Sequence, residues 1–206
     1  MLIAVETSDI VESTKLSAQQ YEQVIAILTE QLVSMSQNYS FTFEQFRGDA
    51  FQITYKRPEC AMLVLLLVRL RMMYAIEKSP IYLTQSLAIG KQTISNKMGP
   101  VYILSGRTLD KVKSGDLALV SSQNLQSVDL TLSTKFLHNV INGLTQKQAE
   151  VLFMYVYSGF TDHQTIADML STTRQNVSTH LARANAELVK DYLMTYENLI
   201  LEQAAC

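Results

Sequence analysis

The stretch FTFEQFRGDAFQITY (residues 41–55) places two short runs of aromatic and β-branched residues on either side of Gly48-Asp49. Residues of these types favour strands. A Gly-Asp pair between two such runs is typical of a tight turn, because glycine adopts positive φ freely and Asp bonds to nearby backbone groups. The stretch therefore predicts a β-hairpin with Asp49 in its turn.

The segments before the hairpin predict one strand and one helix. Residues 2–5 form a short apolar run that suits a buried strand. Residues 17–37 carry apolar side chains at helical spacing, and Ser17 with Gln20 is the pattern of a capping box. A strand and a helix thus precede the hairpin.

The segments after the hairpin repeat this alternation. An apolar helix is expected from Pro58 to about residue 76, with Arg69 and Arg71 emerging at its end. Strands at 81–90 and 116–120 flank a helix at 101–112. The order β-α-β-β-α-β, followed by α and β, predicts an α+β fold built on a ferredoxin-like α/β sandwich.

Composition limits the function classes. The chain has 206 residues, 48% hydrophobic and 17% charged, with a net charge of −2. This is enough apolar material for a core, and it excludes a polycation that wraps nucleic acid along its whole length, so any such contact must be local. Cys60 and Cys206 show no disulfide or metal spacing. The start MLIAVETSD is no signal peptide and the apolar stretch 61–70 is about half a membrane span, so we expect a cytoplasmic protein.

The character of the sequence changes near residue 121. The segment SSQNLQSVDLTLS (121–133) is polar, and the periodicity after Gly143 is wholly helical. We expect a first domain at 1–121, a linker at 122–142, a helical domain at 143–190 and a C-terminal helix at 191–206. The last of these has an apolar face that packs on the other domain or on a partner chain.

Three helices are expected within 143–190. Thr145, Thr161 and either Thr172 or Thr173 are placed to cap them. Their apolar spacing turns one set of side chains inward: Ala149, Leu152, Phe153, Val156, Ile166, Ala167, Leu170, Val177, Leu181 and Ala184. The polar side chains of the third helix then face outward or sideways: Thr173, Arg174, Gln175, Asn176, Ser178, Thr179, His180 and Arg183.

Such side chains hydrogen-bond base edges and phosphates, so the third helix is predicted to be a recognition helix for double-stranded DNA. Residues 172–190 carry Arg174, Arg183 and Lys190 against Glu187, a net of +2. The segments LTQKQAEVL (144–152) and IADMLSTTRQNVSTHLARA (166–184) resemble the helix-turn-helix of LuxR-type regulators and of region 4 of sigma factors. The alternative is a three-helix bundle that contacts only proteins.

The first 120 residues resemble, more distantly, a class III nucleotidyl cyclase domain. The resemblance lies in SDIVESTKL (8–16), FRGDAF (46–51) and LAIGKQTISNKMGPVYILSGRTL (87–109). It implies that Asp9 and Asp49 hold the metal positions and Arg107 the position that neutralises phosphate charge. Ile103 stands where the family has a ribose-orienting Asn, and Gln45 and Asn96 stand where it has purine readers. The whole layout resembles SatD-like proteins.

Cyclisation needs the 3′-oxygen held in line with the α-phosphate. Ile103 offers no hydrogen bond for this, so we expect the chain not to be an enzyme. Three roles remain open for Asp9 and Asp49: holding turns, weakly binding Mg²⁺ or Mn²⁺ with a nucleotide, and cyclase turnover. We expect a homodimeric DNA-binding transcriptional regulator whose first domain dimerises or senses a ligand. The alternatives are a degenerate nucleotidyl cyclase, and a nucleotide sensor that contacts a protein partner.

Overall fold

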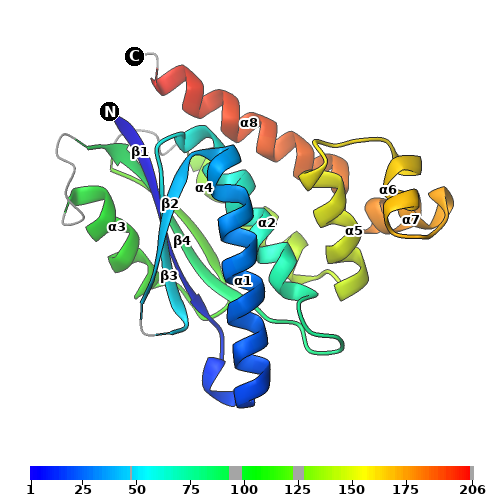
Figure 1. The fold of residues 1–206 in the computed structure, drawn as a ribbon. Helices are drawn as coiled ribbons and strands as arrows, with labels where there is room; N and C mark the ends of the chain where they lie inside the picture. Colours follow the sequence, from blue (N-terminus) through cyan, green and yellow to red (C-terminus); the bar gives the residue numbers. More distant parts are fainter. Residues whose placement is uncertain (47, 93–98, 123–127, 205–206) are drawn as a thin grey trace.

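The computed structural model describes all residues except 47, 93–98, 123–127 and 205–206. It is an α+β structure with one sheet and a helical extension (Figure 1). In chain order the elements are β1 Leu2–Ile10, η1 Ser13–Lys15, α1 Ala18–Tyr39, β2 Phe41–Phe46, β3 Ala50–Tyr55, η2 Pro58–Cys60, α2 Ala61–Met73, β4 Leu83–Lys91, α3 Pro100–Leu109, β5 Leu117–Ser121, α4 Val128–Asn142, α5 Gln146–Tyr157, α6 His163–Met169, α7 Arg174–Arg183 and α8 Ala186–Ala204.

The strands form one sheet in the order β2-β3-β1-β4-β5. The pairs β2–β3, β3–β1 and β1–β4 are antiparallel, and β4–β5 is parallel. The first four strands have the order of a ferredoxin-like sandwich, which confirms the predicted α+β class, with β5 added at one edge. The predicted hairpin at 41–55 is the pair β2–β3, with Phe46 opposite Ala50.

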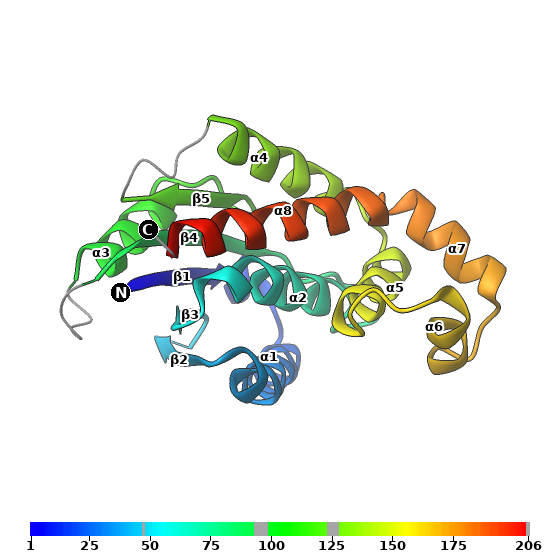
Figure 2. The ribbon, with the colours of Figure 1, turned by 90° about the horizontal axis from the view of Figure 1, so that it is seen from above.

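The two faces of the sheet are covered by different helices. Along β1, Leu2 and Ala4 join the large core under α1 and α2, whereas Ile3 and Val5 join a small cluster with Val101 of α3. Because successive side chains of a strand point to opposite faces, α1 and α2 lie on one side of the sheet and α3 on the other (Figure 2). Within the described residues, no helix has both the length and the apolar character to cross a membrane.

Helix α2 is buried on all sides. It packs on α1, on β1 and β4, and on α5 and α8 of the C-terminal part. This explains why almost every position from Ala61 to Met73 is apolar, since a helix with no solvent face needs no polar stripe. Arg69 and Arg71 are the exceptions to that pattern: Arg71 is half-buried, whereas Arg69 is only 1% exposed. The expectation that Arg69 emerges at the end of the helix is therefore wrong.

The buried guanidinium of Arg69 finds its acceptors in distant segments. Nη1 donates to the carbonyl of Leu83 at 2.8 Å and to Oε1 of Gln85 at 2.9 Å. Nη2 donates to Oδ1 of Asn142 at 2.8 Å and to the carbonyl of Gly115. Burial lowers the pKa of Arg69 to about 10. The side chain thus ties α4 and the turn before β5 to the sheet.

A buried carboxyl group adjoins this network on β1. Glu6 is fully buried and accepts hydrogen bonds from Tyr55 Oη at 2.6 Å, Ser8 Oγ at 2.7 Å and Gln85 Nε2 at 2.9 Å. Burial raises the pKa of Glu6, while these three donors and the charge of Arg69 lower it. Gln85 therefore links the carboxylate and the guanidinium across the core face of the sheet.

The C-terminal part differs from its predicted layout in three places. The region expected as a linker, 122–142, contains α4, which packs on β5 and α8. The second helix of the predicted motif is capped by Asp162, not Thr161, because the Asp162 carboxylate accepts from the backbone N–H groups of Gln164 and Thr165. The C-terminal helix begins at Ala186 rather than 191.

Helix α8 packs back on the sheet-containing part. The hydroxyl of Tyr196, a residue 1% exposed, donates to the carbonyl of Pro58 at 2.9 Å. The side chain of Gln146, at the start of α5, bonds the carbonyls of Met73 and Ile76 at 3.0 and 2.7 Å. One continuous apolar core runs through both parts of the chain.

Candidate functional site

Asp9 and Asp49 lie together at one end of the sheet. Asp9 is on β1 opposite Ala50 of β3, and Asp49 occupies the turn immediately before Ala50. The backbone N–H of Ile10 donates to the carbonyl of Asp49 at 3.2 Å, which holds the turn against the end of β1. Both aspartates are half-buried. The structure therefore brings together the two residues predicted as metal ligands.

The two carboxylates influence each other electrostatically. Burial raises the pKa of Asp9, and the nearby negative charge of Asp49 raises it further, against the backbone N–H of Ile10. Ser13, in the short helix η1, donates its hydroxyl to Oδ2 of Asp49 at 2.6 Å. A divalent cation between the carboxylates would relieve their repulsion.

The donor set suits a hard cation that keeps part of its hydration shell. Carboxylate oxygens are the usual ligands of Mg²⁺ and Mn²⁺ in proteins. In the part of the chain that the structure describes, no third His, Cys, Asp or Glu side chain joins the pair. Water or phosphate oxygens would have to complete the coordination, as Mg²⁺ sites at phosphates commonly do.

The turn itself depends on Gly48. This residue has φ of +86°, and a Cβ at its position would lie 2.3 Å from the hydroxyl oxygen of Tyr21 on α1. Side chains other than glycine are strained at such φ. Tyr21 and Ser13 are two parts of this site that the sequence reasoning missed, and no spacing in the sequence relates either to residues 48–49.

The remaining cyclase-like positions do not join this pair. Gln45 lies opposite Phe51, on the face of the sheet that packs on α1, and its Nε2 donates to Thr29 Oγ1 of α1 at 3.2 Å. Asp9 lies on the other face. Asn96 falls outside the described residues.

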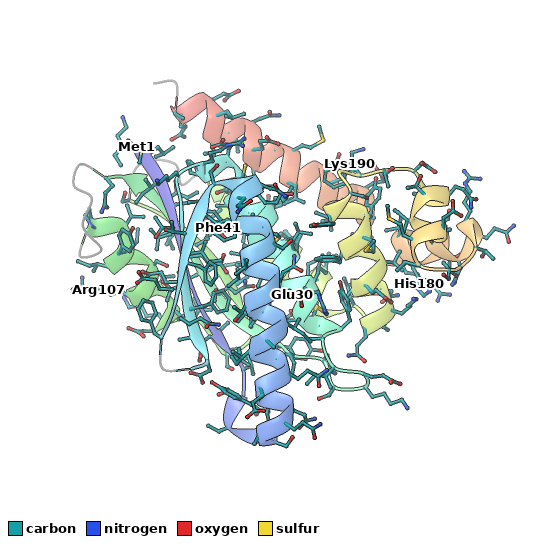
Figure 3. All side chains as sticks on the ribbon, in the orientation of Figure 1. Met1, Glu30, Phe41, Arg107, His180 and Lys190 are labelled. Atoms are coloured by element: carbon teal, nitrogen blue, oxygen red, sulfur yellow. The ribbon has the colours of Figure 1, made fainter. Side chains whose placement is uncertain are left out.

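Arg107 and Ile103 lie one turn apart on the outer side of α3. Both are exposed, Ile103 by 43%. In Figure 3 Arg107 lies on the far side of α3 from α1. Within one chain, the predicted phosphate-neutralising arginine therefore lies on the exposed surface of α3 and not beside the two aspartates.

Helices α5, α6 and α7 pack on one another as a three-helix unit. Thr145 and Thr173 cap α5 and α7 as predicted. Of the inward set, Leu170 is partly buried and the other members are buried. In the outward set, Ser178 and His180 are half-buried, and the exposed members are Thr173, Arg174, Gln175, Asn176, Thr179 and Arg183. The predicted inward and outward sides of α7 are thus those of the structure.

Some of the outward side chains already have partners within the unit. Asn176 Nδ2 donates to Thr172 Oγ1 at 2.9 Å, and Ser178 Oγ lies 2.8 Å from Nδ1 of His163. Nδ1 of His180 is buried and has no hydrogen-bond partner among the described residues. Thr172 and His163 were not predicted to take part in this surface.

Comparisons with solved structures found similarities that cover 57–58% of the chain. The chain is similar to the guanylyl cyclase Cya2, with 15% identity and a TM-score of 0.45 over 58% of this chain and 74% of that one. It is also similar to the adenylyl cyclase CyaB from P. aeruginosa, with 15% identity and a TM-score of 0.46 over 57% and 76%. A bacterial light-regulated adenylyl cyclase gives 14% identity and a TM-score of 0.44 over 57% and 74%.

No family model and no curated protein matches the chain. Nothing in these comparisons bears on the resemblance to SatD-like proteins or to LuxR-type and sigma-factor helices. The expectation that the chain is not an enzyme is contradicted, because the structures that it resembles are cyclases, and we withdraw it. The similarity to these cyclase structures extends over about 57% of the chain.

Proposed function

We propose that this protein is a DNA-binding transcriptional regulator in which a nucleotidyl cyclase-like part is joined to a helix-turn-helix unit formed by α5, α6 and α7. The observation that carries the proposal is the two-sided character of α7. Val177 and Leu181 are buried in the unit, whereas Arg174, Gln175 and Arg183 are exposed. A helix held by its apolar side and free on its polar side fits the major groove of DNA.

The charge of α7 supports a local rather than a general contact with DNA. Arg174 stands at the first turn and Arg183 at the last, so their Cα atoms are about 14 Å apart along a helix that rises 1.5 Å per residue. This separation suits one arginine at a base edge and one at the phosphate backbone. Asn176 and Thr173 hold the start of the helix and would position Arg174.

Selection from a random duplex library followed by fluorescence anisotropy tests the proposal. Arg174→Ala should weaken binding to the selected sequence by about 1–3 kcal/mol and relax specificity at one base pair. Arg183→Ala should weaken all sequences alike and reduce the slope of log K against log salt by about one. Lys111→Ala, an exposed residue after α3, is the matched control and should change neither. No enrichment in the selection, or equal losses in all three variants, contradicts the proposal.

A second candidate function is nucleotidyl cyclase activity, favoured by the meeting of Asp9 and Asp49. The two carboxylates would hold Mg²⁺ or Mn²⁺ with the triphosphate of a nucleotide, and the metal would neutralise charge on the reacting phosphate. Ile103 gives the ribose no hydrogen bond, so a low rate is expected. Arg107, on the exposed side of α3, would reach a nucleotide held by another copy of the chain.

Incubation with ATP or GTP and Mn²⁺, with chromatography for cyclic products, tests this candidate. Activity should be lost in Asp49→Asn and in Asp9→Asn, and kept in Asp110→Asn, which changes an exposed carboxylate at the end of α3. A melting-temperature rise with nucleotide and Mn²⁺ that requires Asp49, without cyclic product, indicates nucleotide sensing instead. If neither signal is observed, the two aspartates are groups that hold the Gly48 turn.

The regulator is also proposed to be a homodimer, since a two-fold DNA site requires two recognition helices about 34 Å apart. Sedimentation of the full-length protein at micromolar concentration tests this, and a monomer under these conditions contradicts it. Full-length protein is needed because α5 and α8 cover α2, and a chain cut before residue 143 would expose that apolar helix.

A further inference from the structure

A cavity of about 480 Å³ lies between α4 and α8, and neither aspartate of the candidate metal pair lines it. Its walls are mainly apolar, with Leu130, Leu137 and Val140 from α4 and Leu188, Tyr192 and Leu199 from α8. Figure 2 shows α4 at the upper edge of the view, beside α8 and near β5. The segment expected to be a linker thus forms one wall of a cavity.

Large apolar side chains stand exposed at the rim of this cavity. Phe136 of α4 is 61% exposed and Leu188 of α8 is 59% exposed. Burying such side chains is favourable in proportion to the apolar area removed from water. An apolar group that enters the cavity would cover both rims at once, which gives the α4–α8 cavity a driving force for binding.

The size of the cavity indicates what kind of occupant fits. Its volume is within the range of about 300–1,000 Å³ that is typical of small-molecule sites. It suits a compact organic molecule.

The polar groups of the lining indicate the chemistry of the occupant. Among the described residues that line the cavity, Asp191 is the one charged residue, and Ser133 and Thr195 add hydroxyl groups. A cationic or hydroxyl group of the occupant would be favoured at this end and an anionic group disfavoured. Because Asp191 is exposed, the effect of its charge should be moderate, up to about fivefold in affinity.

We propose that the α4–α8 cavity binds an amphipathic small molecule, with its aliphatic or aromatic body between the two helices and a cationic group beside Asp191. This site is separate from the Asp9–Asp49 pair and does not depend on DNA binding. The nucleotide and the amphipathic molecule would therefore occupy different parts of the protein.

Three probes with one ten-carbon chain test the proposal by isothermal titration calorimetry of the full-length protein below the micelle concentration. The expected order of affinity is decylammonium, then decanol, then decanoate, each at one molecule per chain. Asp191→Asn should remove the preference of decylammonium over decanol, whereas Glu197→Gln, an exposed α8 carboxylate outside the lining, should keep it. Decanoate binding as tightly as decylammonium would overturn the charge assignment.

A filling variant tests the location. Thr195→Trp places a large side chain in the cavity, and Met194→Trp adds the same group on the neighbouring exposed residue that does not line it. Thr195→Trp should weaken decylammonium at least tenfold, and Met194→Trp should leave it unchanged. Equal binding by both variants overturns the proposal. The proposal is also overturned if no probe binds to the unchanged protein and Thr195→Trp loses self-association, because the occupant would then be a second copy of the chain.

Discussion

Replacing Arg69 by Met should destabilise the protein strongly although Met has a similar length and suits an apolar helix. The change removes donors from the carbonyls of Leu83 and Gly115 and from the side chains of Gln85 and Asn142. The Gly115 carbonyl keeps a second donor, Asn142 Nδ2 at 3.3 Å. The Leu83 carbonyl and the side-chain oxygens of Gln85 and Asn142 would therefore lose the donor that the structure gives them in the core.

The balance of magnitudes decides the sign. Each buried acceptor left without a donor costs about 1–3 kcal/mol, and the carboxylate of Glu6 also loses a favourable charge. Against this, Met removes a buried charge and an Nε–H that has no hydrogen-bond partner among the described residues. Breaking buried charged networks by removing one member usually costs about 3–5 kcal/mol. We expect a loss in that range, a large part of the 5–15 kcal/mol typical of a folded domain.

Urea unfolding followed by circular dichroism measures this loss, with a constant slope m as evidence that the same surface unfolds. Arg71→Met is the matched control on the same helix. Arg71 is half-buried and lies 4.8 Å from the ring centroid of Tyr74, so its replacement should cost at most about 1 kcal/mol. If Arg69→Met costs no more than Arg71→Met, the buried network does not hold α4 and the turn before β5 as argued.

Three further changes test other parts of the structure. Burial and the guanidinium of Arg69 lower the pKa of His138 below its ordinary 6.5, so the free energy of unfolding should fall as the pH drops from 6.5 through the lowered pKa. His138→Gln should flatten this decline when unfolding is measured from pH 8 to 5. Gly48→Ala should cost about 1–3 kcal/mol, because the backbone φ is +86° and the added Cβ would collide with the Tyr21 hydroxyl. In thermal unfolding, Tyr21→Phe should recover the part of this cost that comes from the collision, whereas no recovery would place the whole cost in the backbone. Tyr196→Phe should cost about 0.5–1.5 kcal/mol by removing one of the two donors to the Pro58 carbonyl, which keeps the backbone N–H of Ala61, and faster hydrogen exchange in α8 is the expected accompanying signal; unchanged exchange would show that α8 is held otherwise.

The sequence was sufficient for elements whose causes are local. The capping boxes at Ser17 and Thr145 both form, because each depends only on residues three positions apart. The hairpin at 41–55 was predictable because alternation and a Gly-Asp turn specify it over 15 residues. The inward and outward sides of α7 followed from helical spacing alone.

Features that depend on long-range partners could not be predicted. Arg69 was expected to be exposed because arginine usually is, and the groups that permit its burial come from three distant segments. The polar composition around residue 125 suggested a linker, although residues 128–142 form a helix whose apolar side faces β5 and α8. The pair Asp9 and Asp49 was recognised only through a family resemblance, and Ser13 and Tyr21 were missed because folding, not spacing, brings them there.

The burial of α2 under helices from later in the chain has a consequence for how this protein is made. The helix ends at Met73, whereas Tyr196, which helps to fix its last cover, is synthesised 123 residues later. At about 5–20 residues per second on the ribosome, this delay is roughly 6–25 s. During that time a nascent chain presents one of its most apolar segments, AMLVLLLVRL, without α5 or α8 to cover it. Chaperones that bind emerging apolar segments should therefore engage this protein early and release it only after its last helix has left the ribosome.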